Sequence, residues 1–416
     1  MLAAALTGVL LVREAPAQST PTKAARDTAF LDSLLRAHRY PIRLERGGLA
    51  GPGATLLLAA AQSSQFFMLG ESHNVAEIPR FAAALFDTLH SLRGFTYYAT
   101  ENGAEIIRLA GSRAIRDHED GIFALGRRYP HAFQFWNDQE LDALIRISRR
   151  ATGRGNHLWG LDQEYGALHI LDRLIAIAPS KAARALARQL ADSVRRIESS
   201  RPFQGELRER WIDSADSARW PALRAAFRPI RGSEAARLID ALAFSSGLYK
   251  YNARGAEDNT WYFRSNFERE EHMKEAFMGA YRQAQRSGDS LPRVLLKFGT
   301  VHGGKWLNNM KVHTLGSFLH GFAKSNGHAS FHLIAWLVNE PGTFWSLAES
   351  PAYLPVARVG STKEWIIVDL RPIRAQSYTG KLGALSRELN DVLFAYDAVL
   401  LIGGGTRGTH RRLGAP

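Results

Sequence analysis

Residues 65–99, QFFMLGESHNVAEIPRFAAALFDTLHSLRGFTYYA, are the stretch that decides the fold. The short apolar runs at 65–69 and 95–99 have the composition of buried strands. Between them, apolar side chains recur at the three- and four-residue spacing of one helix face. These side chains are Ala82, Leu85, Phe86 and Leu89. A strand, a helix and a second strand in this order form a βαβ unit, which implies parallel strands joined by a right-handed crossover.

Similar apolar runs, each bounded by Gly, Asp or Asn, recur along the rest of the chain. The predicted strands are 65–69, 95–99, 157–161, 293–298, 331–338, 365–370 and 398–402. The sequence therefore predicts an α/β fold with a central, mostly parallel sheet flanked by helices. Residues 166–290 carry Ala, Arg and Leu at helical spacing and no convincing strand, which indicates a large helical insertion at one edge of the sheet.

The two ends of the chain differ from its middle in composition. Residues 1–17 hold an apolar stretch too short to span a bilayer and end in Ala15-Pro-Ala17, which is typical of a signal-peptide remnant. We therefore expect an exported protein, periplasmic or extracellular. Residues 18–55 predict an N-terminal lead-in with one helix around 27–38, and residues 56–416 predict a single α/β catalytic domain that carries the insertion.

Composition excludes several classes of function. The 416 residues include no Cys, which excludes disulfides, thiolate zinc sites and Cys nucleophiles. The net charge is +13, but the Arg residues are scattered among acidic ones, and no nucleic-acid-binding motif occurs. We expect no nucleic-acid partner and no integral membrane segment. The sequence does not determine the oligomeric state.

Four predicted strands end in side chains that can carry out acid–base chemistry. The first is followed by Glu71 and His73, the second by Glu101, the third by Asp162 and the fourth by His302. Ligands of parallel α/β sheets bind beyond the carboxyl ends of the strands, so we expect these residues to line one rim. Crowded carboxylates and imidazoles offer general bases, shifted pKa values and ligands for a divalent cation.

The loop after the first strand contributes two further charged residues. Pro79 favours a helix that begins at about Ile78, because Pro is tolerated in the first turn and not deeper. Glu77 then lies in the loop before the helix. Arg80 falls in the first turn, where the helix dipole disfavours a cation, so we expect it either to be solvated or to pair with Glu71 or an anionic substrate.

Several sequence blocks resemble the erythromycin esterase superfamily and its relatives, the ChaN-like haem-binding and TraB/Tiki-like proteins. The resemblance covers roughly residues 60–405, and its specificity comes from the order of the blocks. They are Met68-Leu-Gly-Glu-Ser-His73, the strand ending in Glu101, Gly160-Leu-Asp162, Arg269-Glu-Glu-His-Met273, Val294-Leu-Leu-Lys-Phe-Gly-Thr-Val-His302, Thr314-Leu-Gly316 and Phe394-Ala-Tyr-Asp-Ala-Val-Leu400.

The resemblance implies roles for the residues of the rim. His73 would be the general base that activates water, and Glu71 would orient it or act as a second acid or base. Glu101 would be a second carboxylate in the pocket, and His302 an oxyanion or substrate contact. The charge-stabilising groups would be Arg80 and Arg269, and Asp162 and Glu77 complete the expected substrate-binding set.

The resemblance supports a secreted hydrolase of ester or amide bonds that acts on a small molecule or peptide. Ser72-His73-Asn74 is closer to the ChaN-like pattern than to the Thr-His-Gly of erythromycin esterases, and His302 is followed by Gly303-Gly304 in place of a second His. These departures favour general hydrolysis over macrolide cleavage. The alternative is a non-catalytic haem or small-ligand binding protein of the ChaN-like type.

No cofactor is required by the sequence, although a divalent metal or haem is possible. A metal would use Glu71, His73, Glu101 and His302, and no compact metal motif supports it. Haem would use His73 or His302 as axial ligand with Tyr97 or Tyr98 nearby, although both tyrosines are expected in the core.

Three weaker motifs have ordinary interpretations. Gly403-Gly-Gly-Thr-Arg-Gly408 fits a dinucleotide-binding pattern, but too few residues follow it to form the helix that holds a pyrophosphate, so we expect a flexible tail. Ser72 lies in a near match to the nucleophile elbow, whose fifth position is not Gly here. The aromatic residues of the insertion favour a helical core, with a wall for a hydrophobic substrate as the alternative. They are Trp211, Trp220, Trp261, Tyr262 and Phe263.

Overall fold

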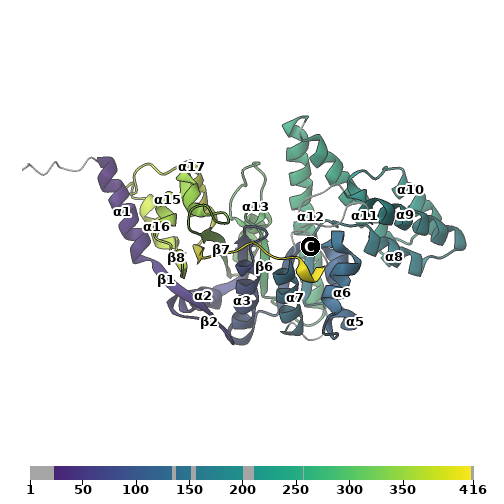
Figure 1. Cartoon of the computed structure of the whole chain (residues 1–416), viewed down its shortest axis with the longest axis horizontal. Coiled ribbons are helices and arrows are strands. Elements are labelled where there is room, and N and C mark those ends of the chain that lie inside the picture. Colours follow the sequence, from purple (N-terminus) through teal and green to yellow (C-terminus); the bar gives the residue numbers. More distant parts are fainter. Residues whose placement is uncertain (1–22, 134–136, 151–155, 200–209, 256, 414–416) are drawn as a thin grey trace, which may run out of the picture.

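A nine-stranded sheet forms the centre of the computed structural model (Figure 1), which describes residues 23–413 except 134–136, 151–155, 200–209 and 256. The strand order is β2-β1-β8-β9-β7-β3-β6-β4-β5. The strands are β1 (Arg39–Glu45), β2 (Gly48–Ala50), β3 (Ser64–Glu71), β4 (Tyr97–Gly103), β5 (Leu158–Asp162), β6 (Val294–Gly299), β7 (Ala329–Val338), β8 (Trp365–Asp369) and β9 (Ala398–Gly403).

Six neighbouring strands, from β9 through β7, β3, β6 and β4 to β5, are parallel. Strand β8 is antiparallel to β9, and β1 and β2 complete that edge with antiparallel pairing. The predicted mostly parallel α/β fold is confirmed, and all seven predicted strands are present. Strand β4 begins at Tyr97, two residues later than predicted.

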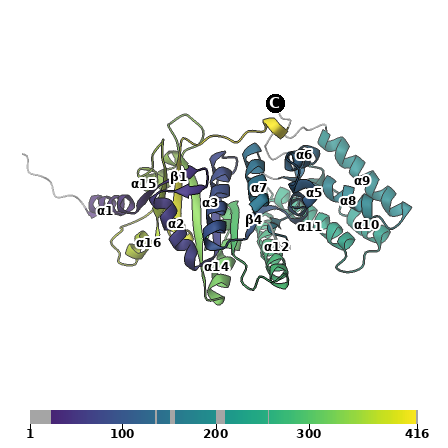
Figure 2. The same ribbon diagram turned by 90° about the horizontal axis from the view of Figure 1, so that it is seen from below.

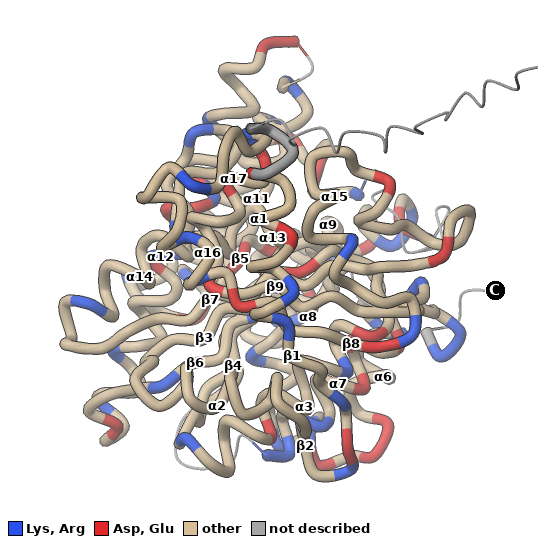
Figure 3. The backbone as a smooth tube through the Cα atoms, turned by 90° about the vertical axis from the view of Figure 1, so that its left-hand side faces the viewer, with Lys and Arg blue, Asp and Glu red and all other residues tan. Residues whose placement is uncertain are grey.

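Helices cover both faces of the sheet, because its buried strands present apolar side chains in both directions. In β3, Phe67 and Leu69 pack against one core, whereas Phe66 and Met68 pack against the other. The first face is covered by α2 (Pro52–Ser63), α3 (Glu77–Arg93), α6 (Gly121–Arg128) and α7 (Asp138–Arg150). The opposite face is covered by α1 (Lys23–Ala37), α12 (Asn259–Arg286), α14 (Leu315–Ser325), α15 (Leu354–Ala357), α16 (Arg371–Ser377) and α17 (Arg387–Ala395). Figure 3 shows α2 and α3 on one side of the strands and basic and acidic positions interspersed along the chain.

A group of helices extends from the β5 edge of the sheet and lies at the end of the molecule opposite α1 (Figures 1 and 2). It comprises α8 (Leu168–Ile177), α9 (Lys181–Ser199), α10 (Arg219–Phe227) and α11 (Glu234–Arg254). These helices share their own core, which includes Trp211 and Trp220. The following helix, α12, connects this group to the sheet, because Met273 and Phe277 pack against the strands.

The short elements near the N-terminus were only partly predicted. Helix α1 matches the expected helix, but β1, β2 and the start of α2 lie in the segment for which no other element was predicted. The reason is that Ile42 is the one buried side chain of β1, so this edge strand has no apolar run. Residues 1–17 lie outside the described residues, and export stays a prediction. In the part of the chain that is described, no helix has the length and apolarity needed to span a bilayer.

The segment after β9 is held in place, so the expectation of a flexible tail is wrong. The backbone N–H of Gly408 donates to the carbonyl of Asn74 at 2.8 Å, and Arg407 forms a β-bridge with Val75. The two carboxylate oxygens of Glu77 accept hydrogen bonds from the backbone N–H and the hydroxyl of Thr406, each at 2.8 Å. Between residues 404 and 413 only one short 3-10 helix follows the glycines, and no dinucleotide-binding helix. The C-terminal segment therefore fixes the loop that carries His73.

Candidate active site

Strands β3, β6, β4 and β5 are parallel neighbours, so their carboxyl ends lie along one edge of the sheet. Glu71 ends β3, Glu101 lies near the end of β4, and Asp162 ends β5. His302 lies in α13 (Thr300–Gly303), a single turn that directly follows β6. The fold thus brings together the acid–base residues that the sequence placed at four strand ends.

His73 is the accessible member of the group, with 26% of its side chain exposed. Its Nδ1 lies 3.3 Å from Glu71 Oε1, and its Nε2 lies 4.0 Å from Glu101 Oε2. Asn74 has a φ of 64°, a left-handed conformation that Asn tolerates and that turns the chain directly after His73. Burial acts to lower the pKa of His73, but the hydrogen bond to Glu71 and the charges of Glu101 and Glu71 raise it overall.

Glu101 is the centre of the site, and both of its oxygens are engaged. Oε2 accepts the backbone N–H of Gly299 at 2.6 Å, and Oε1 accepts from Arg269 Nη2 at 2.7 Å. His302 Nε2 lies 3.5 Å from Oε1. Burial acts to raise the pKa of Glu101, but His302, Arg269 and His73 lower it to about 2. Glu101 is therefore negatively charged at neutral pH and a poor proton acceptor, and it lies between two imidazoles.

A second imidazole–carboxylate pair lies behind Glu101. His302 Nδ1 is 2.7 Å from Glu270 Oε1, and Glu270 Oε2 accepts the backbone N–H of Leu315 at 2.7 Å. His302 and Glu270 are both buried. Glu270 follows Arg269 on α12. No role was predicted for it, because its contact with His302 arises only from the tertiary fold.

Arg269 is fixed by the carboxylates around it. Its Nε donates to Asp162 Oδ1 at 2.9 Å and to Gln163 Oε1 at 3.1 Å. Its Nη2 donates to both Glu101 and Asp162. Among the described residues, Nη1 has no hydrogen-bond partner. Asp162 therefore positions the guanidinium, and Nη1 is the donor that remains for a ligand.

Lys297 lies in the middle of β6, and Glu71 and Glu140 bind it from two sides. Its Nζ is 2.7 Å from Glu71 Oε2 and 2.8 Å from Glu140 Oε1, and the lysine side chain is 2% exposed. Burial acts to raise the pKa of Glu71, but Lys297 and His73 lower it overall. Lys297 was not predicted as a site residue, although a lysine within the apolar stretch 294–298 was a visible signal. Glu140 gave no such signal, because it lies on a helix with many charged positions.

The residues at this edge do not fit a metal site. Across the described parts of the chain, no three or more His, Asp or Glu side chains are grouped as metal ligands. Arg269 and Gly299 take up the oxygens of Glu101, and Lys297 takes up one oxygen of Glu71. A haem ligand role does not fit His302 either, because both of its ring nitrogens face carboxylates in the interior. Tyr97 and Tyr98 are buried core residues, as expected.

Two residues of the expected substrate-binding set lie outside this group. Helix α3 begins at Glu77, one residue earlier than predicted, and Pro79 is its third residue. The Glu77 carboxylate is used by Thr406. Arg80 is exposed in the first turn and makes no ion pair or hydrogen bond with any described residue. Of the two expectations for Arg80, exposure to solvent is confirmed. Among the described residues, Arg80 does not pair with Glu71.

The aromatic residues of the insertion do not form one group. Trp211 and Trp220 are buried in the helical core, as the ordinary interpretation predicted. Trp261 is partly buried and stacks on Tyr251 at 5.5 Å, whereas Tyr262 and Phe263 are exposed near the start of α12. The predicted core is therefore confirmed for the two tryptophans of the segment before α11 only.

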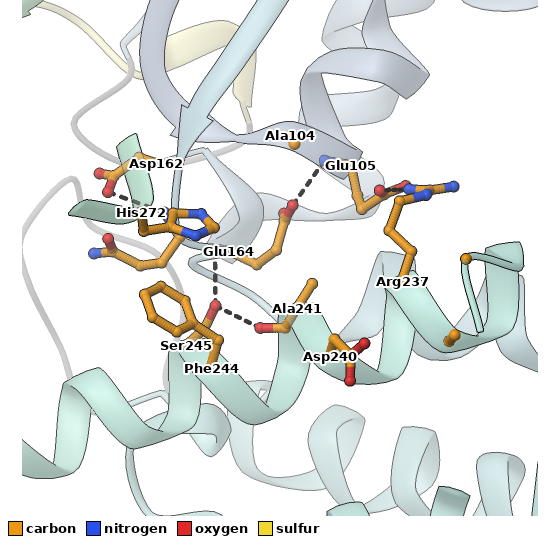
Figure 4. Close-up of a pocket in the computed structure, with 13 residues that line it drawn as sticks. Ala104, Glu105, Asp162, Glu164, Arg237, Asp240, Ala241, Phe244, Ser245 and His272 are labelled. Carbon is orange, nitrogen blue, oxygen red and sulfur yellow. Dashed lines mark hydrogen bonds and ion pairs between the residues drawn. The ribbon is translucent and has the colours of Figure 1, made fainter. Parts of the chain in front are cut away.

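A cavity of about 530 Å³ lies between the residues that follow β4, the residues that end and follow β5, and helices α11 and α12 (Figure 4). Asp162 and Gln163 line this cavity and also accept hydrogen bonds from Arg269, so the cavity lies next to the Arg269 side chain. Its lining includes Phe244, whose ring stacks on His272 at 4.3 Å, together with charged residues such as Glu105, Arg237 and Asp240. This composition suits a ligand that has both an apolar part and polar groups.

Comparison with known proteins shows a shared fold. No protein-family model matches the sequence, and no curated protein matches it. A solved succinoglycan biosynthesis protein has 12% identity and a TM-score of 0.59, covering 92% of this chain and 98% of its own. A Bacillus cereus protein has 13% identity and a TM-score of 0.55 with the same coverage. A mutant of the erythromycin esterase EreC in its open conformation has 16% identity and a TM-score of 0.54, covering 89% of this chain and 98% of its own. At these identities, the three structures show that the fold is shared and nothing more.

Proposed function

We propose that this protein hydrolyses ester or amide bonds, with His73 as the base that takes a proton from the attacking water. The observation that carries the proposal is the arrangement Glu71–His73–Glu101. Glu71 accepts a hydrogen bond from Nδ1, so Nε2, which lies 4.0 Å from Glu101 Oε2, would be the nitrogen that takes the proton. Glu71 also stabilises the imidazolium that forms, so the pair supplies both orientation and charge.

Arg269 and His302 complete the proposed centre. The free Nη1 of Arg269 would stabilise the negative oxygen of a tetrahedral intermediate, because its guanidinium is already oriented by Asp162 and Glu101. His73 would then return the same proton to the leaving group. His302, whose ring nitrogens face Glu270 and Glu101, would hold the Glu101 carboxylate in place. The proton thus moves from water to His73 Nε2 and on to the leaving group, and Glu101 stays negatively charged throughout.

The cavity beside Arg269 would take an apolar part of a small-molecule or peptide substrate. Ala241 lines the cavity from α11, so Ala241→Phe would fill part of it. We expect a higher KM for esters with bulky apolar acyl groups and little change for acetate esters. Ala253→Phe, on an exposed position of the same helix, is the matched control. Equal effects on both ester sizes would remove the cavity from the proposal.

The decisive experiment is hydrolysis of a panel of chromogenic esters and peptides by wild type, Glu71→Gln and His73→Ala. Each protein is measured with and without EDTA, and His118→Ala, an exposed histidine, is the control. Loss of activity in the two site variants but not in the control supports the proposal. Absence of hydrolysis by wild type, or equal activity in the variants, contradicts it and favours ligand binding. A haemin titration of the same proteins then tests that alternative.

A further inference from the structure

A buried lysine in the centre of a strand requires an explanation. Lys297 occupies a buried position in β6, where its neighbours Leu296 and Phe298 are fully buried. Removing its charge from water is costly, and buried ion pairs are often no more stabilising than apolar residues of the same volume. Stability alone is therefore a weak reason for the lysine and its partner Glu140, and a link to the site is a stronger one.

The contacts of Lys297 form a continuous series that ends at His73, which is partly exposed. Glu140 Oε1 lies 2.8 Å from Lys297 Nζ, and Lys297 Nζ lies 2.7 Å from Glu71 Oε2. The other oxygen of Glu71 faces His73 Nδ1 at 3.3 Å. Because Glu71 binds the lysine with one oxygen and the imidazole with the other, Lys297 fixes the rotation of the Glu71 carboxylate.

Resting on the proposed function, we infer that Glu140 is a positioning residue, which acts through Lys297 to hold Glu71 in hydrogen-bond contact with His73. Glu140 lies on α7, which covers the same face of the sheet as α3, and its carboxylate reaches Lys297 from that layer. Without it, Lys297 would have Glu71 as its one carboxylate partner. The positive charge of the lysine would then be balanced by Glu71 alone. Glu71 would therefore stabilise the protonated imidazole of His73 less strongly.

The electrostatics of the group agree with this role. Burial raises the pKa of Glu140 to about 7, with Lys297 opposing the rise. Burial acts to lower the pKa of Lys297, but Glu140 and Glu71 raise it, so the lysine stays charged. The titratable groups that face this lysine are Glu71 from β3, Tyr98 from β4 and Glu140 from α7. The charges of Lys297, Glu71 and Glu140 together therefore determine the electrostatic potential at His73.

Helix α7 offers a matched control for Glu140. Asp138 is also buried, but its carboxylate accepts from Thr409 Oγ1 at 2.9 Å and from the backbone N–H of Arg412 at 3.2 Å. It does not contact Lys297, Glu71 or His73. Glu140→Gln and Asp138→Asn therefore remove one buried carboxylate each from the same helix, and only the first carboxylate belongs to the series.

The test is an NMR titration of His73 in the full chain, with histidine labelled and the His73 signal assigned by its absence in His73→Ala. Glu140→Gln should lower the pKa of His73 by about 0.5 unit, since Lys297 is then less neutralised. Asp138→Asn should leave it unchanged. If Glu140→Gln does not fold, Glu140→Asp replaces it and should shift the pKa in the same direction by a smaller amount. A His73 titration that is identical in wild type and the Glu140 variant overturns the inference.

A kinetic measurement gives the second readout. Glu140→Gln should lower kcat about tenfold with little change in KM, since a positioning defect acts on the proton transfer and not on binding. The NMR result does not depend on turnover. If wild type hydrolyses nothing while Glu140→Gln still shifts the His73 titration, the proposed function fails and the positioning role stands.

Discussion

The two histidine centres, His73 in the loop after β3 and His332 in the neighbouring strand β7, have pKa values shifted in opposite directions. His73 lies between Glu71 and Glu101 and has a raised pKa. His332, in β7, is fully buried, and its ring contacts the carbonyl of Gly303 at 2.7 Å and Ser330 Oγ at 2.8 Å. Burial, together with the charge of Lys305, lowers the pKa of His332 to about 3. One imidazole is therefore held in reach of protonation, and the other is kept neutral.

Asp397 explains why the second centre is structural. It accepts the backbone N–H of His332 at 2.9 Å, and its carboxylate also binds Lys305 at 2.6 Å and Arg374 at 3.0 Å. The carboxylate of this centre is thus used by two cations and a backbone donor, and it does not contact the imidazole ring. A buried carboxylate beside a histidine orients the imidazole only when it faces a ring nitrogen, as Glu71 does for His73 and Asp397 does not for His332.

The largest expected effect separates the two histidines directly. His73→Ala should lower kcat/KM about 100- to 10,000-fold, which is the usual contribution of a general base, while the free energy of unfolding changes little. His332→Gln should lower the melting temperature because it disturbs buried hydrogen bonds, and the folded fraction should keep kcat within about threefold. Kinetics and thermal denaturation of both variants test the comparison. Similar losses of kcat in the two would contradict it.

The next effect concerns the close approach of the backbone to His73. A Cβ at Gly299 would lie 2.9 Å from His73 Nε2 and 3.2 Å from Glu101 Oε2. Gly299→Ala should therefore displace the imidazole and lower kcat about 10- to 100-fold, with the fold retained. Gly279→Ala, where a Cβ would meet nothing within 4 Å, is the control, and it lies on α12 outside the site. Wild-type kcat in Gly299→Ala would show that Nε2 is not the reacting atom.

The sheet and its rim could be predicted from sequence because local signals specify them. The apolar runs define the parallel strands, and the carboxyl ends of such strands converge, so Glu71, Glu101 and His302 were expected to lie together. Strand β1 was not predicted, because an edge strand with one buried side chain has no periodic signal. Glu140 and Glu270 could not be assigned roles, because their partners lie more than 30 residues away on other elements.

The roles of Arg80 and Arg269 also could not be predicted from the sequence. Both were expected to stabilise charge, and the sequence gives no basis for choosing between them. The structure surrounds Arg269 with Asp162 and Glu101, whereas Arg80 is exposed. The difference arises from α12, which approaches the ends of β4 and β5 from the helical insertion, and no local pattern in either motif encodes that approach.

The pH dependence of activity gives a smaller, sharper test of the first centre. His73 accepts a proton only when neutral, and its pKa is raised above the ordinary value of 6.5. The kcat/KM of wild type should therefore rise with pH through a midpoint above 6.5. Glu71→Gln removes a charge that raises this pKa, so its residual activity should rise at a pH about one unit lower. An unchanged midpoint would mean that Glu71 does not face the titrating group.

The smallest expected effect concerns Glu101 and Asp397, the carboxylates near the two histidines, because the pKa of each is lowered. The pKa of Glu101 is lowered to about 2 from an ordinary 4.5, and that of Asp397 to about 2 from 3.8, in each case by cations that outweigh burial. A lowered folded-state pKa gives stability that is present above the unfolded pKa and lost as the pH falls toward the folded one. Wild type should therefore lose stability between about pH 4.5 and 2.

Glu101→Gln and Asp397→Asn should each be less stable than wild type at pH 7 but should flatten the loss on acidification. The expected difference is on the order of 1 kcal/mol per centre between pH 4.5 and 3, measured by urea denaturation. Glu45→Gln is the control, because Glu45 forms only an exposed pair with Arg43 at 3.6 Å. If Glu101→Gln loses stability as steeply as wild type, Glu101 is not the cation-bound anion that separates the two imidazoles. The distinction between the centres would then rest on burial of the histidines alone.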